Sequence, residues 1–303
     1  MKKLAAVLLA LALFAPCALA ESNFPVYQVR APGSEATVYL FPSIHAADER
    51  AYPLSSIVQN AYSASDFLAV ECDVIAAESD ILTSLRVMQK IRLPAGQRVT
   101  RFIPQELFEQ AKAFLIERNR YANMYENCHP YLLGSAMENA ILAECGLEEQ
   151  GGLDLYFLQR AREDGKAILE METAEEQAAL VVDQLPAGVW TALLKSYLPP
   201  NDAVKRERGQ ALYEALLQGD SDAVEALLAS EGAEIFAPEE QDLFDAYNNT
   251  MLVQRGEKMT AAVLGYLKEG KNVFVAVGAA HVLEAEGLVN SLQNAGCAVR
   301  RIE

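Results

Sequence analysis

Two of the three histidines in this sequence follow short apolar segments that have the character of strands. "VYLFPSIH" ends in His45 and "FVAVGAAH" ends in His281, and the two segments align without gaps. Glu71 follows a third apolar segment, "DFLAV". Imidazole and carboxylate groups together are ligands for Zn, Mn, Co or Fe. The sequence therefore predicts a divalent-metal site with His45, His281 and Glu71 as ligands.

Each of these side chains also has a purely structural interpretation. A histidine after a strand can cap a turn, and a buried carboxylate needs a partner. Arg255 could supply that partner by forming a salt bridge with Glu71. His129 lies directly before a proline in a helical region, and we interpret it as structural. Glu172 and Asp154 are further candidates that could support the metal ligands.

The spacing of apolar residues predicts an α/β fold. Strands are expected at Val26–Arg30 and Thr37–Phe41, a helix in "YPLSSIVQNAYSAS", and a short buried strand in "DFLAVECD". Near the C-terminus, "NVFVAV", a loop with His281, a helix and a final strand repeat this order. Such units build mostly parallel sheets, in which ligands bind beyond the carboxyl ends of the strands. We therefore expect the two histidine corners to lie side by side.

The chain between these two ends, about 76–270, is predicted to be a large helical region. It includes the amphipathic helix "PQELFEQAKAFLIER" and a helix over 153–163, which a strand at 167–170 follows. Thr173 and Glu176 have the spacing of a capping box, which predicts the start of another helix.

The first twenty residues have the features of a secretory signal peptide. Two lysines precede an apolar run that ends in Ala18-Leu19-Ala20. A retained membrane anchor is the alternative, although the run is short for a membrane span. We expect residues 21–303 to form a single domain with the helical region as an insertion. This domain would be periplasmic or secreted, without stable membrane insertion.

The charge and cysteine content restrict the possible partners and bonds. The net charge is −17, and loss of Lys2 and Lys3 with the signal gives about −19, which repels nucleic acid. Four cysteines follow the signal, and an even number in an exported protein permits disulfides. Of the three possible connectivities we favour Cys128 with Cys145, because both flank one predicted helix. The oligomeric state is not encoded in any recognisable pattern.

At the residues described above, the sequence resembles the TraB/GumN family, whose relatives include the Tiki proteases. The resemblance covers nearly all of residues 21–303. It is carried by "SIH", "VECD", "GLD", "ETAEEQ", "VQRGEKM" and, most specifically, "VFVAVGAAHVLEAEGLVNSLQNAGCAVRR". The family is marked by two Gly-x-x-His motifs and a glutamate. The resemblance implies divalent-metal-dependent proteolysis, with which these residues are associated in Tiki-type members.

The family motifs fall on the residues already singled out. His45 belongs to the first motif, Gly278 and His281 to the second, and Glu71 is the glutamate. Arg255 falls at the family's arginine, and the next residue is glycine where asparagine is usual. The resemblance implies that His45, His281 and Glu71 bind a divalent ion such as Mn, Co or Zn. Glu71 would be a ligand or the general base, and Arg255 would stabilise an oxyanion or pair with Glu71.

One residue departs from the family pattern. Pro42 stands where the first motif should begin with glycine, and proline fixes φ near about −65° and lacks a backbone N–H. Our leading hypothesis is an exported metal-dependent hydrolase that acts on a peptide or a small molecule, most simply a peptidase. The alternative, which Pro42 favours, is a non-catalytic periplasmic binding or accessory protein, for example in polysaccharide export. A third possibility is a helical scaffold around a sheet with no site.

Overall fold

The computed structural model describes residues 21–303, so the expected signal peptide, residues 1–20, lies outside the described residues. One six-stranded sheet has the order β4-β3-β5-β2-β1-β6. Neighbouring strands from β4 to β2 are parallel, whereas β1 is antiparallel to both β2 and β6. This confirms the expected mixed α/β fold around a mostly parallel sheet. The strands are β1 (Val26–Arg30), β2 (Val38–Ser43), β3 (Phe67–Val70), β4 (Ala167–Glu170), β5 (Val273–Gly278) and β6 (Ala298–Ile302).

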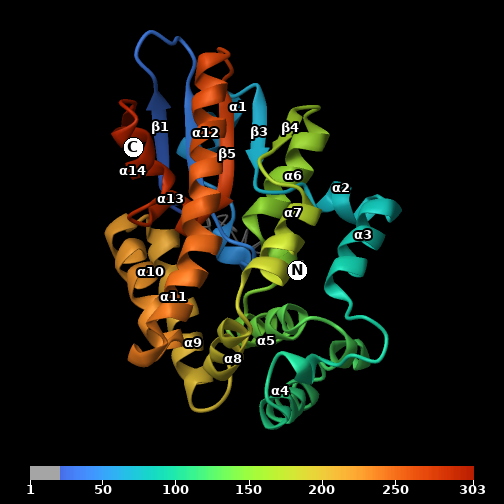
Figure 1. Cartoon of the computed structure of the whole chain (residues 1–303). Coiled ribbons are helices and arrows are strands. Elements are labelled where there is room, and N and C mark those ends of the chain that lie inside the picture. Colours follow the sequence, from blue (N-terminus) through green and yellow to red (C-terminus); the bar gives the residue numbers. More distant parts are fainter. Residues whose placement is uncertain (1–20) are drawn as a thin grey trace, which may run out of the picture.

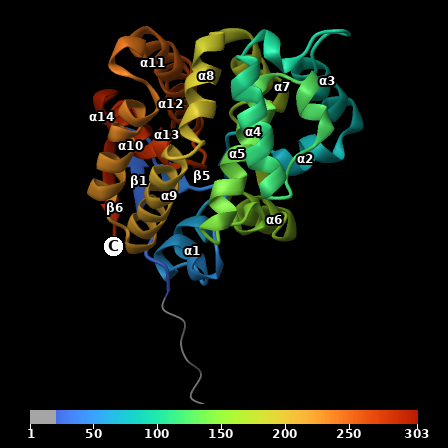
Figure 2. The ribbon, with the colours of Figure 1, turned by 90° about the horizontal axis from the view of Figure 1, so that it is seen from below.

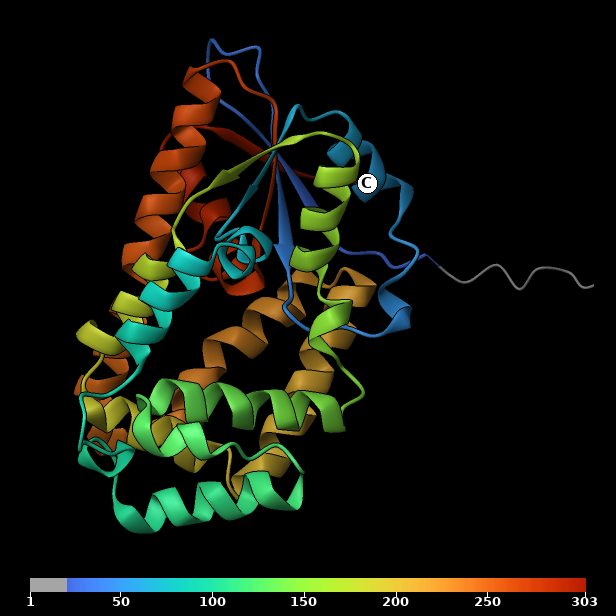
Figure 3. The same cartoon turned by 90° about the vertical axis from the view of Figure 1, so that its right-hand side faces the viewer.

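Helices cover both faces of this sheet. On one face lie α1 (Ser56–Ser63) and α6 (Leu153–Glu163), and on the other lie α12 (Gln254–Lys268) and α14 (Leu288–Asn294), as Figure 3 shows for α6 and α12. The short helix α13 (Ala279–Leu283) begins directly after β5. The two helical layers make the centre of the sheet inaccessible to water.

Local sequence explains the positions of the central strands. β5 lies between β2 and β3, and its first five residues, "VFVAV", are all buried, as expected for a parallel strand covered on both faces. β2 is longer than predicted and includes Pro42. The β1 ladder along β2 ends at Leu40, so at Pro42 the strand pairs only with β5. The missing N–H of Pro42 therefore interrupts no β1 pairing.

An aromatic cluster fixes β2 and β5 against the helices on one face. Phe41 of β2 and Phe274 of β5 pack with Phe157 of α6 and Tyr62 of α1. The ring centroids of Phe157 and Phe274 are 4.7 Å apart, which is within the range of favourable aromatic pairs. This packing holds the two strands that end in the histidine corners.

A large helical region lies beyond the carboxyl ends of the parallel strands (Figure 1). It has a hydrophobic core of its own that includes Phe114, Leu133, Met137 and Trp190. Figure 2 looks at the molecule from that end, with helices of this region in front of the strands. The helices are α4 (Gln105–Glu117), α5 (Pro130–Glu144), α8 (Ala187–Ser196), α9 (Asn201–Gln218), α10 (Ser221–Ile235) and α11 (Gln241–Asn248).

Three further helices connect this region with the sheet. α2 (Val74–Ser79) and α3 (Ile81–Ile91) follow β3, and α7 (Ala174–Ala179) follows β4. The predicted capping box is present at the start of α7, where Thr173 and Glu176 bond to each other's backbone N–H. The helical middle region is thus confirmed, while its description as an insertion in one domain stays a prediction.

The favoured disulfide is wrong. All four cysteines after residue 20 are free. Cys128 lies just before α5 and Cys145 just after it. A helix of 15 residues is about 22 Å long at about 1.5 Å per residue, whereas a disulfide joins Cα atoms about 4.4–6.8 Å apart. Because the two cysteines lie at opposite ends of α5, their thiols are too far apart to form a disulfide.

Within residues 21–303, no helix combines the length and the apolar character that crossing a membrane requires.

Candidate functional site

The two histidine corners lie next to each other in the sheet. β2 and β5 are parallel neighbours, with Pro42 opposite Val277 and Ser43 opposite Gly278. His45 and His281 therefore follow adjacent strand ends, as the aligned segments led us to expect. The third strand of the group, β3, pairs with β5 on its other side and is followed directly by Glu71. The three candidate ligands thus come from three neighbouring carboxyl ends.

Glu71 is held in place by two donors from other elements. The Gly278 N–H donates to Glu71 Oε1 over 2.8 Å, and Arg255 Nη2 donates to Oε2. Burial opposes ionisation of this carboxyl group. The charges of His281, Arg255 and His45, with the Gly278 hydrogen bond, outweigh burial and lower the pKa of Glu71 to about 2. Glu71 is therefore a fixed anion at the centre of the site.

Arg255 joins two carboxylates that follow different strands. Its Nε donates to both oxygens of Glu172 over 3.0 Å, and its Nη2 donates to Glu172 over 2.7 Å as well as to Glu71. Burial alone would lower the pKa of Arg255, but the two carboxylates raise it above its usual value. Arg255 is the second residue of α12, which directly follows the π-helical segment Asn249–Val253. The sequence-based pairing with Glu71 is thus present, and Glu172 shares it.

His281 is a buried member of the same group. It lies in α13 and is 6% exposed. Burial lowers its pKa, while the charge of Glu71 acts in the opposite direction. The ring is therefore neutral near pH 7, which is the form in which imidazole binds a metal.

His45 is arranged differently, because its ring faces Asp154 of α6. Its side chain is 69% exposed, and Nδ1 lies 2.8 Å from Asp154 Oδ2. The Asp154 carboxylate accepts this hydrogen bond, so Nδ1–H is the donor. The hydrogen bond to Asp154 is the main cause that raises the pKa of His45 to about 9, with help from the charges of Glu71 and Glu138, so the ring is protonated at pH 7.

The glycine before α6 allows this contact. The Leu153 N–H donates to the Ile44 carbonyl over 3.0 Å, which draws the start of α6 against the His45 corner. A Cβ at Gly152 would lie 2.5 Å from the His45 carbonyl oxygen, so a larger residue would push the two segments apart. The other carboxylate oxygen, Asp154 Oδ1, is buried without a hydrogen-bond partner within residues 21–303.

The structure therefore brings the predicted residues to one edge of the sheet. Within the described part of the chain, no three His, Cys, Asp or Glu side chains stand close enough together to hold a metal ion. Metal ligation by His45, Glu71 and His281 stays a prediction. His129, which we interpreted as structural, accepts a hydrogen bond from the Tyr131 N–H at the start of α5 and packs against Phe102 and Trp190.

Sequence reasoning missed the residues that the helical region contributes. Glu138 of α5 is near enough to His45 for each charge to act on the other's pKa. Tyr247 of α11 is affected in the same way by Arg255 and Glu138. No motif marks these residues, because an acidic or aromatic side chain on an amphipathic helix looks like an ordinary surface or core position.

A comparison with protein families decides what kind of protein carries this arrangement. The model of the TraB/PrgY/gumN family matches residues 25–301. The chain belongs to the TraB/PrgY/gumN family. This confirms the resemblance to the family that the sequence suggested.

Curated relatives add little about activity. The chain is 23% identical over 164 residues to the uncharacterized protein YbaP of Shigella flexneri and to that of Escherichia coli strain K12. Each match covers 54% of this chain and 58% of the relative, so the chain spans little more than half the length of these relatives. No solved structure matches the chain significantly.

Proposed function

We propose that this protein is an exported metal-dependent hydrolase, most simply a peptidase, with His45, His281 and Glu71 as metal ligands. The observation that carries the proposal is that His45, Glu71 and His281 follow the carboxyl ends of three neighbouring strands, with Glu71 held there as a fixed anion. Export rests on the signal-like sequence of residues 1–20.

The donor set has the chemistry that a divalent ion requires. Two imidazoles and a carboxylate suit Zn, Mn or Co. Because Nδ1 of His45 bonds to Asp154, Nε2 is the nitrogen that would bind the ion, which would have to displace the proton that the raised pKa keeps on the ring at pH 7. Such carboxylate–histidine pairs are common around metal ligands. When bound, the ion would supply Lewis acidity for hydrolysis.

The hydrogen bonds of Glu71, Arg255 and Asp154 suggest a separate role for each residue. Both oxygens of Glu71 already accept hydrogen bonds, which favours a role as fixed ligand over a role as a free general base. Arg255 donates to Glu71 and Glu172, so we assign it the positioning of Glu71 rather than the direct binding of an oxyanion. Asp154 orients His45.

A non-catalytic binding or accessory role is the second candidate, and one observation favours it. The Gly278 N–H binds Glu71, but Pro42 at the matching position of the other corner has no N–H to offer. If catalysis requires both corners to donate in this way, the protein would keep the fold and a ligand site without turnover.

Metal analysis tests the proposal, and the third histidine supplies a matched control. The purified protein should bind about one equivalent of Mn, Co or Zn by mass spectrometry of metal content. His45→Ala and His281→Ala should lose it, while His129→Asn, far from the site in sequence and role, should keep it. Equal metal content in all four proteins would contradict the proposal.

Turnover separates the two candidates. A peptide library incubated with the protein and Mn, Co or Zn should show cleavage that His45→Ala and His281→Ala abolish. Stoichiometric metal without any cleavage would support the non-catalytic alternative instead.

A further inference from the structure

A cavity in the helical region opens between α5, α9 and α10, close to the candidate site. Its volume is about 180 Å³. That is the volume of several water molecules at about 30 Å³ each, enough for the five non-hydrogen atoms of a lysine side chain. Its apolar wall is formed by Ile141, Leu142, Leu212, Leu227 and Leu228.

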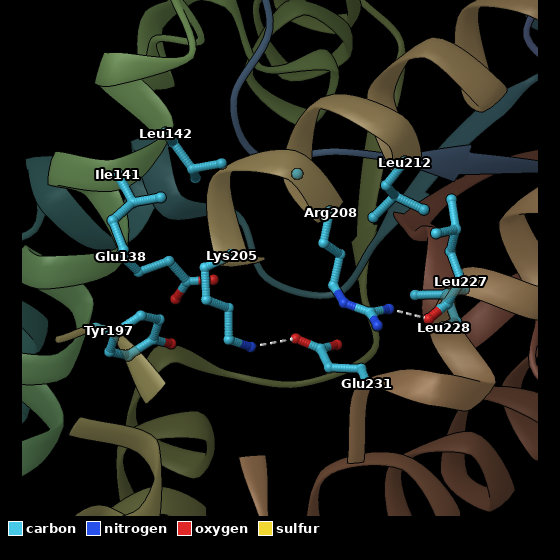
Figure 4. A pocket seen from close by; sticks show the side chains of 11 residues that line it. Glu138, Ile141, Leu142, Tyr197, Lys205, Arg208, Leu212, Leu227, Leu228 and Glu231 are labelled. Atoms are coloured by element: carbon cyan, nitrogen blue, oxygen red, sulfur yellow. Dashed lines mark hydrogen bonds and ion pairs between the residues drawn. The ribbon is translucent and has the colours of Figure 1, made fainter. Parts of the chain in front are cut away.

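One carboxylate in this cavity lacks a cationic partner. Lys205 Nζ pairs with Glu231 at 2.9 Å, and Arg208 Nε pairs with Glu234 at 2.7 Å. Figure 4 shows Lys205 directed toward Glu231 and Arg208 directed toward the Leu227 carbonyl, both away from Glu138. Glu138 forms no ion pair with any residue in the described part of the chain. The two cations of the cavity are thus neutralised, and the charge of Glu138 is left over.

A buried tyrosine accompanies this carboxylate. Tyr197 at the end of α8 is 9% exposed, and Figure 4 shows its hydroxyl directed into the cavity near Glu138. The charge of Glu231 acts to raise the pKa of Glu138, while Lys205, His45 and the Tyr197 hydroxyl act to lower it. A carboxylate without a cationic partner attracts a cation that enters the cavity.

The neighbouring cavity is lined by acidic residues without basic ones. It has a volume of about 270 Å³ and shares Leu228 and Glu231 with the first. Glu225, Glu284 and Glu286 also line it, and no lysine or arginine does. The space beside the candidate site therefore favours positive charge over negative charge.

Electrostatic interactions also connect the first cavity with the candidate site. Glu138 lines the cavity and acts on His45. Tyr247 lines the second cavity and is affected by Arg255. A substrate whose reacting bond lies at His45 could therefore extend a side chain toward Glu138.

We infer that the cavity between α5, α9 and α10 binds a basic side chain of the substrate, an ammonium group on a short methylene chain, with Glu138 as its partner. The apolar wall packs against the methylene groups, and Glu138 with the Tyr197 hydroxyl accepts hydrogen bonds from the ammonium group. That the bound group belongs to a substrate rests on the proposed function. Binding of a basic side chain in the cavity requires neither metal nor turnover.

Binding of three small probes to the protein without added metal tests the inference. The probes are Nα-acetyl-lysine methylamide and its norleucine and glutamate counterparts, titrated by NMR. The lysine probe should bind at least about tenfold more tightly than the norleucine probe, because only it forms the charge-assisted hydrogen bond. Equal binding of these two, or tighter binding of the glutamate probe to Lys205 and Arg208, would overturn the inference.

Variants locate the binding. Glu138→Gln should remove the preference for the lysine probe, and Glu207→Gln, which makes the same charge change on an exposed part of α9, should not. A Cβ at Gly209 meets only Leu142, at 3.7 Å, so Gly209→Leu has room to fill the cavity. It should weaken both the lysine and the norleucine probe while every charge is kept. Unchanged binding in Glu138→Gln or Gly209→Leu would place the probe elsewhere and refute the inference.

The result is independent of the hydrolase proposal. A lysine preference that depends on Glu138, found in a protein that cleaves no peptide with any metal, would refute only the proposed turnover. Cleavage that shows no dependence on a basic residue in the peptide, together with absent probe binding, would refute only the pocket.

Discussion

The backbone N–H of Gly278 donates a hydrogen bond to Glu71 Oε1 over 2.8 Å, which ties the end of β5 to the end of β3. The glycine is not needed for its backbone conformation, since its φ of −50° and ψ of 142° suit other residues. It is needed for space: a Cβ there would lie 3.1 Å from Glu71 Oε1. The motif glycine therefore lets the strand end approach the glutamate.

Gly278→Ala tests this explanation. The added methyl group should displace the Glu71 carboxylate by a few tenths of an ångström and reduce metal affinity or turnover by about tenfold or more. Stability should change by less than about 1 kcal/mol, because the backbone is not strained. Metal titration and urea unfolding measure the two effects. A large loss of stability with normal metal affinity would show that the glycine serves the fold instead.

Arg255 should be essential for stability, because it is the cation between two carboxylates. Replacing it with methionine leaves Glu71 and Glu172 buried next to each other without compensation, which should cost about 3–5 kcal/mol of the free energy of unfolding. Arg86→Met is the control, since its pair with Glu175 is exposed and should contribute less than about 1 kcal/mol. Equal, small losses in both variants on urea unfolding would contradict the bridging role.

The parts of the fold that short sequence patterns determine were predictable. The apolar run of β5, the helix over 153–163 and the capping box of α7 follow from local signals, and each has its expected structure. The two histidine corners were expected side by side because both repeat one strand-and-turn pattern, and the register of β2 with β5 places them so.

The direction of side chains at the site was not predictable in the same way. His45 turns to Asp154 because Gly152 lets α6 pack beneath the His45 carbonyl, a contact between residues over a hundred positions apart. Glu138 gains its significance only when α9 and α10 enclose a cavity next to α5. Such surroundings arise from long-range packing, so the sequence of each helix alone shows only an ordinary polar face.

Asp154 should control how well His45 binds a metal. Asp154→Asn removes the charge that accepts from Nδ1–H and orients the ring, so metal affinity should fall about 10–100-fold. Asp164→Asn, at the other end of α6, should leave it unchanged. Calorimetric metal titration of the three proteins measures the difference. An unchanged affinity in Asp154→Asn would mean that His45 does not bind the ion through this arrangement.

His129 should make the protein less stable in acid, independently of the candidate site. Burial lowers the pKa of this histidine from 6.5 to about 4, and Asp183 only partly opposes this. Between these two pH values the unfolded chain binds a proton that the folded protein does not, so stability is full above about pH 6.5 and falls as the pH decreases toward 4. The loss should approach about 3 kcal/mol at the acid end.

His129→Asn isolates this contribution. Asparagine is a good helix N-cap and can still accept the hydrogen bond from the Tyr131 N–H, but it does not titrate. The variant should be less stable than the wild type at pH 7, because its side chain no longer packs against Phe102 and Trp190. Its free energy of unfolding should nevertheless decrease less between pH 7 and pH 4.5. Parallel pH profiles for the two proteins on urea unfolding would show that His129 is not the group responsible, since every other titrating residue is common to both.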